Sequence, residues 1–322
     1  MKSLIKKLVE TVGPSGYESK IRAVIQAEIE GHVDDMRVDA LGNLITRKGK
    51  EGGLKVMLAA HMDEIGVMVT HVDEDGFVRF TNIGGVYPRN CVGGHVRFLN
   101  DTVGVIQIER EDDRRTVPPL EKMYIDVGAK NRKGCPVKVG DIAVFERPFL
   151  DLGDRLVSKA MDDRIGVALL VETLRQMKET PYQVFFVFSA QEEVGTRGAI
   201  TAAYGVNPDI GLAADVTLTG DTPKSIKMEV SVGKGPAIKV RDSGMLSDPR
   251  IVDWMAKTAQ KAKIPYQLEV LDGDQQTHAR FKSTGRAFLP AAYPFHAVMS
   301  TRRQKWSIMG MSRRVYVCWL SC

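Results

Sequence analysis

The chain has 322 residues, 43% of them hydrophobic and 26% charged, which is the balance of a soluble globular protein with one large domain or two. Its net charge of +5 arises in residues 274–322, which hold eight Lys or Arg and one acidic residue. The nearly neutral remainder gives no reason to expect a nucleic-acid partner. No apolar run approaches the roughly 18 to 20 residues of a membrane span, so a membrane protein is not expected either.

The four cysteines of the chain show no metal-ligand spacing: Cys91, Cys135, Cys318 and Cys322. Four scattered cysteines are more typical of the reducing cytoplasm than of a disulfide framework. The first residues alternate Lys and Glu with apolar residues at helical spacing. This pattern predicts a surface helix rather than a signal peptide. We therefore expect a cytoplasmic protein.

The first sixty residues show the patterns of an α/β fold. Apolar spacing predicts helices over 4–12 and 20–29, on either side of the turn Gly13-Pro14-Ser15-Gly16. Short strands are expected over 36–39 and 43–47, and a continuous apolar strand over 54–60.

From about residue 67 to 149 short strand patterns alternate with glycine-containing turns, and no strong helix pattern occurs. The α/β pattern then returns, with a helix after 158–164, strands over 183–188 and 209–216, a helix over 248–261 and a strand over 264–271. We therefore predict a mixed-sheet α/β catalytic domain formed by residues 1–66 and 150–322. A small all-β barrel or sandwich, residues 67–149, is expected to be inserted in it.

Acidic or imidazole side chains are expected at four strand ends: His61, Asp162, the pair Glu192-Glu193, and Asp215. Each alone has an ordinary alternative as a loop residue or a helix cap. Together they form an N/O ligand set suited to Zn²⁺, Co²⁺ or Mn²⁺. A bridging carboxylate with ligands on both sides holds two metal ions roughly 3.5–4 Å apart. A neighbouring free carboxylate then moves the proton, which explains a pair of acids.

Four motifs occur in order: residues 60–66 (AHMDEIG), 159–164 (KAMDDR), 191–199 (QEEVGTRGA) and 214–215 (AD). This set resembles the M42 family of metallo-aminopeptidases, which includes tetrahedral (TET) and glutamyl aminopeptidases and some members labelled endoglucanases. The match runs from the N-terminus to about Gly273. The resemblance implies a zinc-peptidase fold of the phosphorylase/hydrolase-like type, and a hydrolase that removes N-terminal residues from peptide substrates.

The resemblance also implies roles for individual residues. His61, Asp162 and Asp215 would bind one metal ion, with Asp162 bridging to a second ion that Glu193 binds. Glu192 would be the general base that generates an attacking metal-bound hydroxide, and Asp63 would orient His61. The two ions would be Zn or Co, with Mn also suitable. The inserted β domain would mediate dimerisation within a homo-oligomer, a dodecamer built from dimers.

Residues 274–322 depart from the family pattern. The family has a further His ligand in a Pro-x-Arg-Tyr-x-His-Ser segment preceded by Gly-Thr-Asp-Ala, and both are absent here. His278 and His296 lie in this region, but their neighbours do not match. Suitable codons in a shifted reading frame spell TDARAIQVN across 275–284 and CRYVHSPAEVVDYGDVEK across 296–314. Our hypothesis is that the chain is frameshifted near Gly273 and that its C-terminal segment is aberrant. If the segment is genuine, we expect weak occupancy by the second metal.

Two other functions stay open at this point. Without the C-terminal His, the chain is an inactive or impaired pseudoenzyme that survives as an assembly subunit. With the metals kept and the substrate changed, it is a related two-metal deacylase or carboxypeptidase. Glycoside cleavage fits less well, because it normally needs two carboxylates that flank the sugar rather than a dinuclear site.

Overall fold

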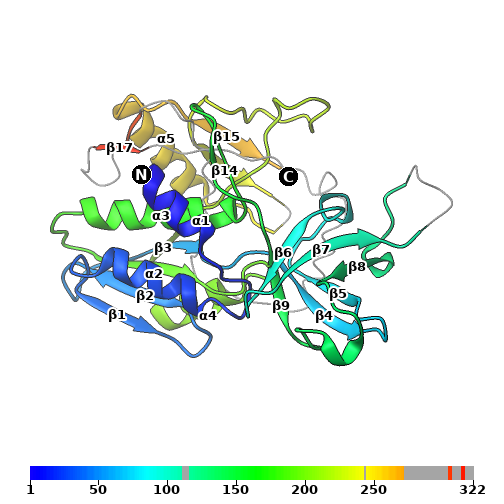
Figure 1. Ribbon diagram of the computed structural model, residues 1–322. Coiled ribbons are helices and arrows are strands. Elements are labelled where there is room, and N and C mark those ends of the chain that lie inside the picture. Colours follow the sequence, from blue (N-terminus) through cyan, green and yellow to red (C-terminus); the bar gives the residue numbers. More distant parts are fainter. Residues whose placement is uncertain (111–115, 243, 272–303, 307–312, 316–322) are drawn as a thin grey trace.

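A five-stranded mixed sheet forms the centre of the α/β part of the protein (Figure 1). The computed structural model describes residues 1–110, 116–242, 244–271, 304–306 and 313–315. In spatial order the strands are β1 (Asp35–Val38), β2 (Leu44–Lys48), β12 (Gln183–Ser189), β3 (Lys55–His61) and β13 (Ile210–Ala213). Strands β12, β3 and β13 are parallel, and β1 and β2 are antiparallel to their neighbours. The predicted mixed α/β sheet is therefore confirmed.

Helices cover both faces of this sheet. One face packs on α1 (Lys2–Glu10), α2 (Ser19–Ile29) and α3 (Met161–Gln176), and the other on α4 (Arg197–Val206). Successive residues of β12 supply the two cores, since Phe186 and Phe188 join the first and Val187 joins the second. A central strand buried on both faces must be apolar throughout, which explains the continuous apolar run of β12.

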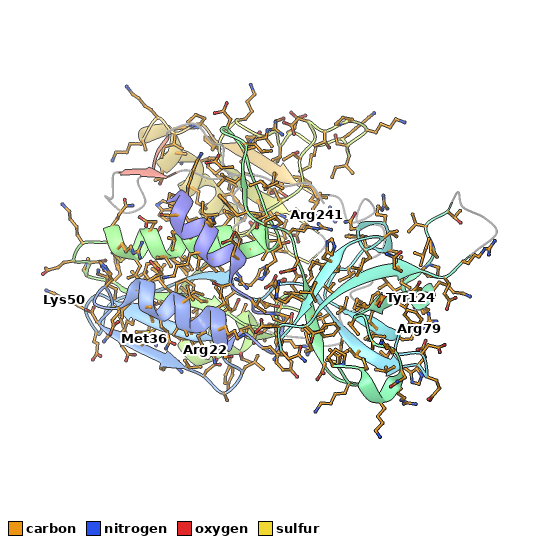
Figure 2. All side chains as sticks on the ribbon, viewed as in Figure 1. Arg22, Met36, Lys50, Arg79, Tyr124 and Arg241 are labelled. Carbon is orange, nitrogen blue, oxygen red and sulfur yellow. The ribbon has the colours of Figure 1, made fainter. Side chains whose placement is uncertain are left out.

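The strands between residues 66 and 145 close into a six-stranded barrel with a hydrophobic core of its own. Figure 1 shows this barrel beside the mixed sheet. On its surface the guanidinium of Arg79 lies 6.0 Å from the ring centre of Tyr124 (Figure 2). In barrel order the strands are β4 (Gly66–Val72), β5 (Val78–Ile83), β8 (Met123–Asp126), β7 (Val103–Ile108), β6 (His95–Phe98) and β9 (Ile142–Phe145).

The remaining elements are short, apart from helix α5. Helix α5 (Pro249–Lys261) begins after Asp248, whose side chain accepts a hydrogen bond from the backbone N–H of Arg250. The two-stranded sheets are β10 (Leu150–Asp151) with β11 (Leu156–Val157), β14 (Ala237–Arg241) with β15 (Gln267–Val270), and β16 (Gln304–Trp306) with β17 (Arg313–Val315). Single 3₁₀ turns lie at η1 (Pro88–Asn90), η2 (Leu120–Lys122) and η3 (Arg132–Gly134).

Several expectations extend beyond what the structure tests. The frameshift hypothesis and the missing His ligand concern residues 274–322, which lie outside the described residues except for two backbone segments. The assignment of residues 1–66 and 150–322 to one domain and 67–149 to another stays a prediction. In the described part of the chain, no helix combines the length and the apolar character needed to cross a bilayer.

Asn43 joins the β1–β2 hairpin to the segment that follows β12. Its side-chain oxygen accepts from the backbone N–H of Ala190 at 2.9 Å, and its amide nitrogen donates to the carbonyl of Gly198 at 3.0 Å. The same nitrogen donates to the Asp39 carboxylate at 2.7 Å. The residue is fully buried, so water cannot replace these bonds. Asn43 therefore helps to fix where the Glu192-Glu193 segment begins.

We expect Asn43→Ala to lower the free energy of unfolding by about 1–3 kcal/mol, because it leaves the buried N–H of Ala190 without its hydrogen-bond acceptor. Urea denaturation followed by circular dichroism measures this change. Asn100→Ala is the control, since Asn100 is exposed and water can take over its hydrogen bonds. Equal effects of the two substitutions would contradict the assignment.

Candidate metal centre

Three parallel strands bring most of the predicted site residues to one edge of the sheet. His61 is the last residue of β3 and pairs in register with Ser189, the last residue of β12. Glu192 and Glu193 follow β12, and Asp215 follows β13. Because these strands are parallel, their carboxyl ends meet at the same edge, where open α/β sheets place their ligands.

Asp162 reaches this edge from a different kind of element than the sequence predicted. We expected it at a strand end, but it lies in the first turn of α3, where Asp162 and Asp163 have non-helical backbone angles. The strand that precedes it, β11, has only two residues and pairs with β10 outside the mixed sheet. The expectation was wrong because β11 is too short for its pairing to be recognised from the sequence pattern.

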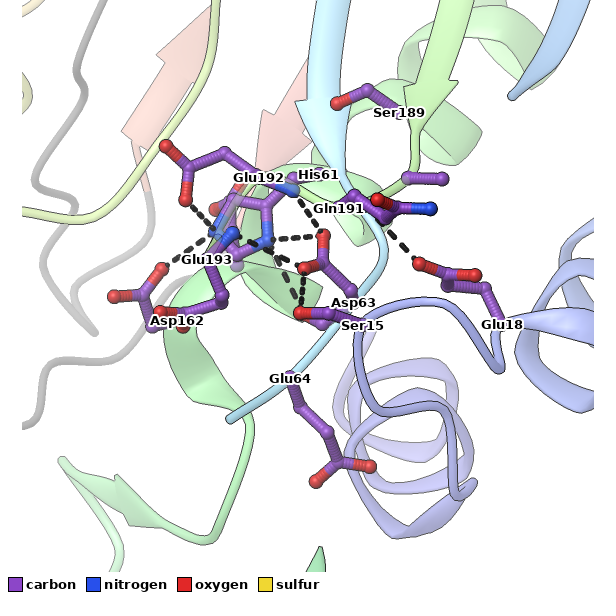
Figure 3. Close-up of polar contacts among 12 residues, drawn as sticks. Ser15, Glu18, His61, Asp63, Glu64, Asp162, Ser189, Gln191, Glu192 and Glu193 are labelled. Carbon is purple, nitrogen blue, oxygen red and sulfur yellow. Dashed lines mark hydrogen bonds and ion pairs between the residues drawn. The ribbon is translucent and has the colours of Figure 1, made fainter. Parts of the chain in front are cut away.

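The imidazole of His61 is the centre of the cluster (Figure 3). Its Nε2 lies 2.9 Å from Oδ1 of Asp162 and 3.8 Å from Oε2 of Glu192. One ligand atom each from His61, Asp162 and Asp215 can be chosen so that all three lie within 4.8 Å of one another. One imidazole nitrogen and two carboxylate oxygens at this spacing can hold a single divalent cation.

Glu193 is not part of this group of three. The backbone of Gly84, in the segment after barrel strand β5, lies against it. A Cβ added at Gly84 would lie 2.9 Å from Cβ and 3.0 Å from Oε2 of Glu193, and Gly84 has a φ of +76°. Glycine is suited to such a close approach in a left-handed conformation. Burial and the nearby charge of Asp162 raise the pKa of Glu193 to about 9.

Asp63 fixes both the histidine and the pair of glutamates. Its carboxylate accepts hydrogen bonds from the Ser15 hydroxyl at 2.6 Å and from the backbone N–H groups of Glu192 and Glu193 at 2.9 and 3.1 Å. Nδ1 of His61 lies 3.2 Å from the Asp63 carbonyl and 3.4 Å from its Oδ1. A proton held on Nδ1 leaves Nε2 available to a cation.

Negative charges are crowded around the imidazole. Burial and the charge of Asp162 raise the pKa of Asp215 and of Glu192. Burial and the charge of Asp215 raise the pKa of Asp163, whose Oδ2 is buried without a hydrogen-bond partner. Although burial alone would lower it, hydrogen bonds to Asp162 and Asp63 raise the pKa of His61 well above its ordinary value. A divalent cation would relieve this repulsion, so the residues present fit a metal ion.

The sequence indicated the acids of the cluster and the supporting residue Asp63, but not the other residues that support them. The turn Gly13-Pro14-Ser15-Gly16 was predicted only as a turn, yet Ser15 donates to Asp63 across the site. Glu18 accepts from the backbone N–H of Gln191 at 3.1 Å, and burial raises the pKa of its carboxyl group. Such contacts join residues far apart in the chain and leave no periodic signal.

The fold and the site together define a candidate metallohydrolase built on a mixed α/β sheet. The sequence profile of one family, described as M42 glutamyl aminopeptidase, matches residues 42–291. A protein of Acetivibrio thermocellus named "Putative aminopeptidase" is 47% identical, covering 84% of this chain and 83% of its own length. The lysyl aminopeptidase of Pyrococcus furiosus is 35% identical, and the match covers 83% of this chain and 80% of that protein.

A solved structure agrees with these relatives. The TET1 peptidase of Pyrococcus horikoshii, which can assemble into a tetrahedron or a large octahedral shell, superposes with a TM-score of 0.79. It is 31% identical, and the match covers 92% of this chain and 89% of that one. The chain therefore belongs to the M42 peptidase family, and the resemblance found in its sequence is confirmed.

The crowded carboxylates predict how the metal-free protein responds to pH. The pKa of Glu193 rises from 4.5 to about 9 on folding, so over this window the folded chain keeps a proton that the unfolded chain releases. The raised pKa of His61 acts in the same direction. The free energy of unfolding of the metal-stripped protein should therefore fall as the pH rises from about 4.5 to about 9.

Differential scanning calorimetry at a series of pH values measures this dependence. Saturating Zn²⁺ should weaken it, because bound metal takes the place of the protons, and a titration in weakly buffered solution should detect their release. A melting temperature of the metal-free protein that rises over the same window would contradict this account of the site.

Proposed function

We propose that the chain is a two-metal aminopeptidase that hydrolyses the N-terminal peptide bond of peptides. The observation that carries the proposal is the convergence of His61, Asp162 and Asp215 in a chain of an aminopeptidase family. We assign these three residues to one cation, and Asp162 with Glu193 to a second. When bound, the cations polarise the scissile carbonyl and lower the pKa of a water molecule.

Glu192 is the residue best placed to move the proton. Its Oε2 lies 3.8 Å from Nε2 of His61, and its side chain is 32% exposed, so a substrate can reach it. The raised pKa of its carboxyl group, caused first by burial, makes Glu192 a stronger base than an ordinary glutamate, which suits a group that accepts a proton and then gives it up. Glu192 would take the proton of the attacking water and deliver it to the leaving amine.

The charge of the site also favours a substrate with a free N-terminus. An α-amino group carries a positive charge near neutral pH. The surplus of carboxylates around Asp162, whose side chain is 57% exposed, can attract that charge and orient the peptide. An acylated N-terminus has no such charge, and this difference separates an aminopeptidase from a deacylase.

The relatives and the free cysteines support a proposal for the assembly and the location of the protein. Because TET1 peptidase can assemble into a tetrahedron or a large octahedral shell, and the related structure PhTET1-12s is a dodecamer, we propose that this chain forms a homo-oligomer in which dimers make a dodecamer. In this proposal the inserted barrel mediates dimerisation, as the resemblance of the sequence to the family implied. Cys91 and Cys135 are free, as the reducing cytoplasm would keep them.

The comparisons do not favour the alternative functions. Both relatives reported above are named aminopeptidases, neither a deacylase nor a carboxypeptidase. The expectation of weak binding at the second position rests on residues 274–322 and stays a prediction. We expect the cation of His61, Asp162 and Asp215 to bind more tightly than the one of Glu193.

The two adjacent glutamates should give different results when each is changed to Gln. Glu192→Gln removes the proton carrier, so kcat should fall about 10²- to 10⁴-fold while the metal content is unchanged. Glu193→Gln should instead reduce the metal bound per chain, measured by inductively coupled plasma mass spectrometry. If Glu192→Gln keeps more than about a tenth of the wild-type kcat, Glu192 is not the general base.

Substrate choice tests the reaction class directly. Aminoacyl-p-nitroanilides should be hydrolysed in the presence of Co²⁺ or Zn²⁺, and their N-acetylated counterparts should be cleaved at least about 100-fold more slowly, since one charge contact is lost. A pseudoenzyme would cleave neither compound. A deacylase would instead free the amino group of N-acetyl amino acids, which a ninhydrin assay detects, and would release no p-nitroaniline from the acetylated anilides.

A further inference from the structure

Glu64 and Lys159 form a buried ion pair that the proposed chemistry does not use. Nζ of Lys159 lies 2.8 Å from Oε1 and 2.7 Å from Oε2 of Glu64. The two side chains are only 3% and 10% exposed. Figure 3 shows Glu64 pointing away from His61, on the opposite side of the loop from the carboxylate cluster. The pair therefore lies behind the site rather than in it.

The pair joins the two segments that carry His61 and Asp162. Glu64 comes three residues after His61, and Lys159 comes three residues before Asp162. All the barrel strands, β4 to β9, lie between them in the chain. The ion pair thus connects the segment that precedes the barrel to the segment that follows it. It links segments that backbone pairing of the mixed sheet does not join, since Asp162 is outside that sheet.

The surroundings of Glu64 fix it in this role. Its Oε1 also accepts from the backbone N–H of Gly13 at 3.0 Å and lies 3.7 Å from the guanidinium of Arg164. Its backbone N–H donates to the Gly13 carbonyl at 3.1 Å. The backbone N–H of Lys159 donates to the carbonyl of Arg147, just beyond β9, at 3.4 Å. With its oxygens occupied by these donors, the Glu64 carboxylate is a cross-link and not an additional metal ligand.

We propose that Glu64 and Lys159 are positioning residues whose ion pair sets the separation of His61 and Asp162, and with it the affinity of the cation that these two hold. This inference rests on the proposed function, because it assumes that His61 and Asp162 share a cation. Residues that orient metal ligands typically change metal affinity about 10- to 100-fold when they are replaced.

The test is a titration of the metal-stripped full-length protein with Co²⁺, followed by calorimetry and by the visible absorption of bound cobalt. Lys159→Met should weaken the tighter Co²⁺ site about 10- to 100-fold and alter its absorption spectrum. Lys159→Arg keeps the charge and can still pair with the Glu64 carboxylate, so it should weaken Co²⁺ binding less than Lys159→Met does. The double variant Glu64→Gln/Lys159→Met removes both buried charges, so it keeps the test available if the single variant does not fold.

The double variant should bind Co²⁺ as weakly as Lys159→Met, because the cross-link is missing in both. Ile106→Ala is the control for general destabilisation, since Ile106 is fully buried in the barrel core, a cluster that includes neither member of the ion pair. It should lower the melting temperature while leaving the Co²⁺ affinity unchanged.

The outcomes distinguish a failure of the positioning role from a failure of the proposed function. If the wild type binds Co²⁺ and the folded double variant binds it equally well, the positioning role is wrong and the proposed function survives. An equal loss of affinity in Ile106→Ala would likewise overturn it, since the effect would then report stability alone. If the wild type binds no Co²⁺, the proposed function fails and the inference fails with it.

Discussion

Repulsion among carboxylates around one imidazole is the constraint that the rest of the structure has to satisfy. Asp162, Glu192 and Asp215 lie around His61, and the charge of Asp162 raises the pKa of Glu193. Bringing such groups together costs free energy unless protons or cations neutralise them. Because the pKa values of Glu193 and His61 are raised, we expect protons to provide this neutralisation in the metal-free chain. A divalent cation would provide it better and make the cluster reactive.

Strand pairing and buried hydrogen bonds hold the carboxylates and the imidazole in place. Parallel strands β3, β12 and β13 set the edge, and the buried carboxylate of Asp63 fixes the backbone after β12 together with the imidazole ring. Asp63 keeps a lowered pKa despite its burial because His61 and Ser15 compensate its charge. The same arrangement therefore contains one carboxylate whose pKa is lowered and several whose pKa is raised, which is how one site separates a supporting acid from reactive ones.

The sequence predicted much of the sheet because its strands have simple patterns. The apolar runs of β3 and β12 are long enough to recognise, and the acids after them then lie at a common edge by topology alone. Asp162 was misplaced because β11 has two residues and carries no periodicity. Ser15 and Lys159 lie in segments that the sequence marked, but their partners are 48 and 95 residues away along the chain. Local patterns cannot encode such pairings, whereas side-chain packing in the folded chain determines them.

The barrel also has a part in the site that its sequence did not indicate. Gly84 comes directly after β5 and approaches Glu193, so the barrel contributes a wall to the candidate site as well as the surface proposed for assembly. The Glu64–Lys159 pair lies where the chain leaves for the barrel and returns from it. The ion pair thereby joins the two ends of the barrel segment to the segments that carry His61 and Asp162.

The most direct test of the account is an anomalous-diffraction map of crystals of the protein grown with Co²⁺. The account predicts a strong peak in contact with Nε2 of His61 and with carboxylate oxygens of Asp162 and Asp215. It predicts a weaker second peak beside Glu193, roughly 3.5–4 Å from the first. A map without a peak at His61, or with cobalt bound only elsewhere on the protein, would contradict the central claim.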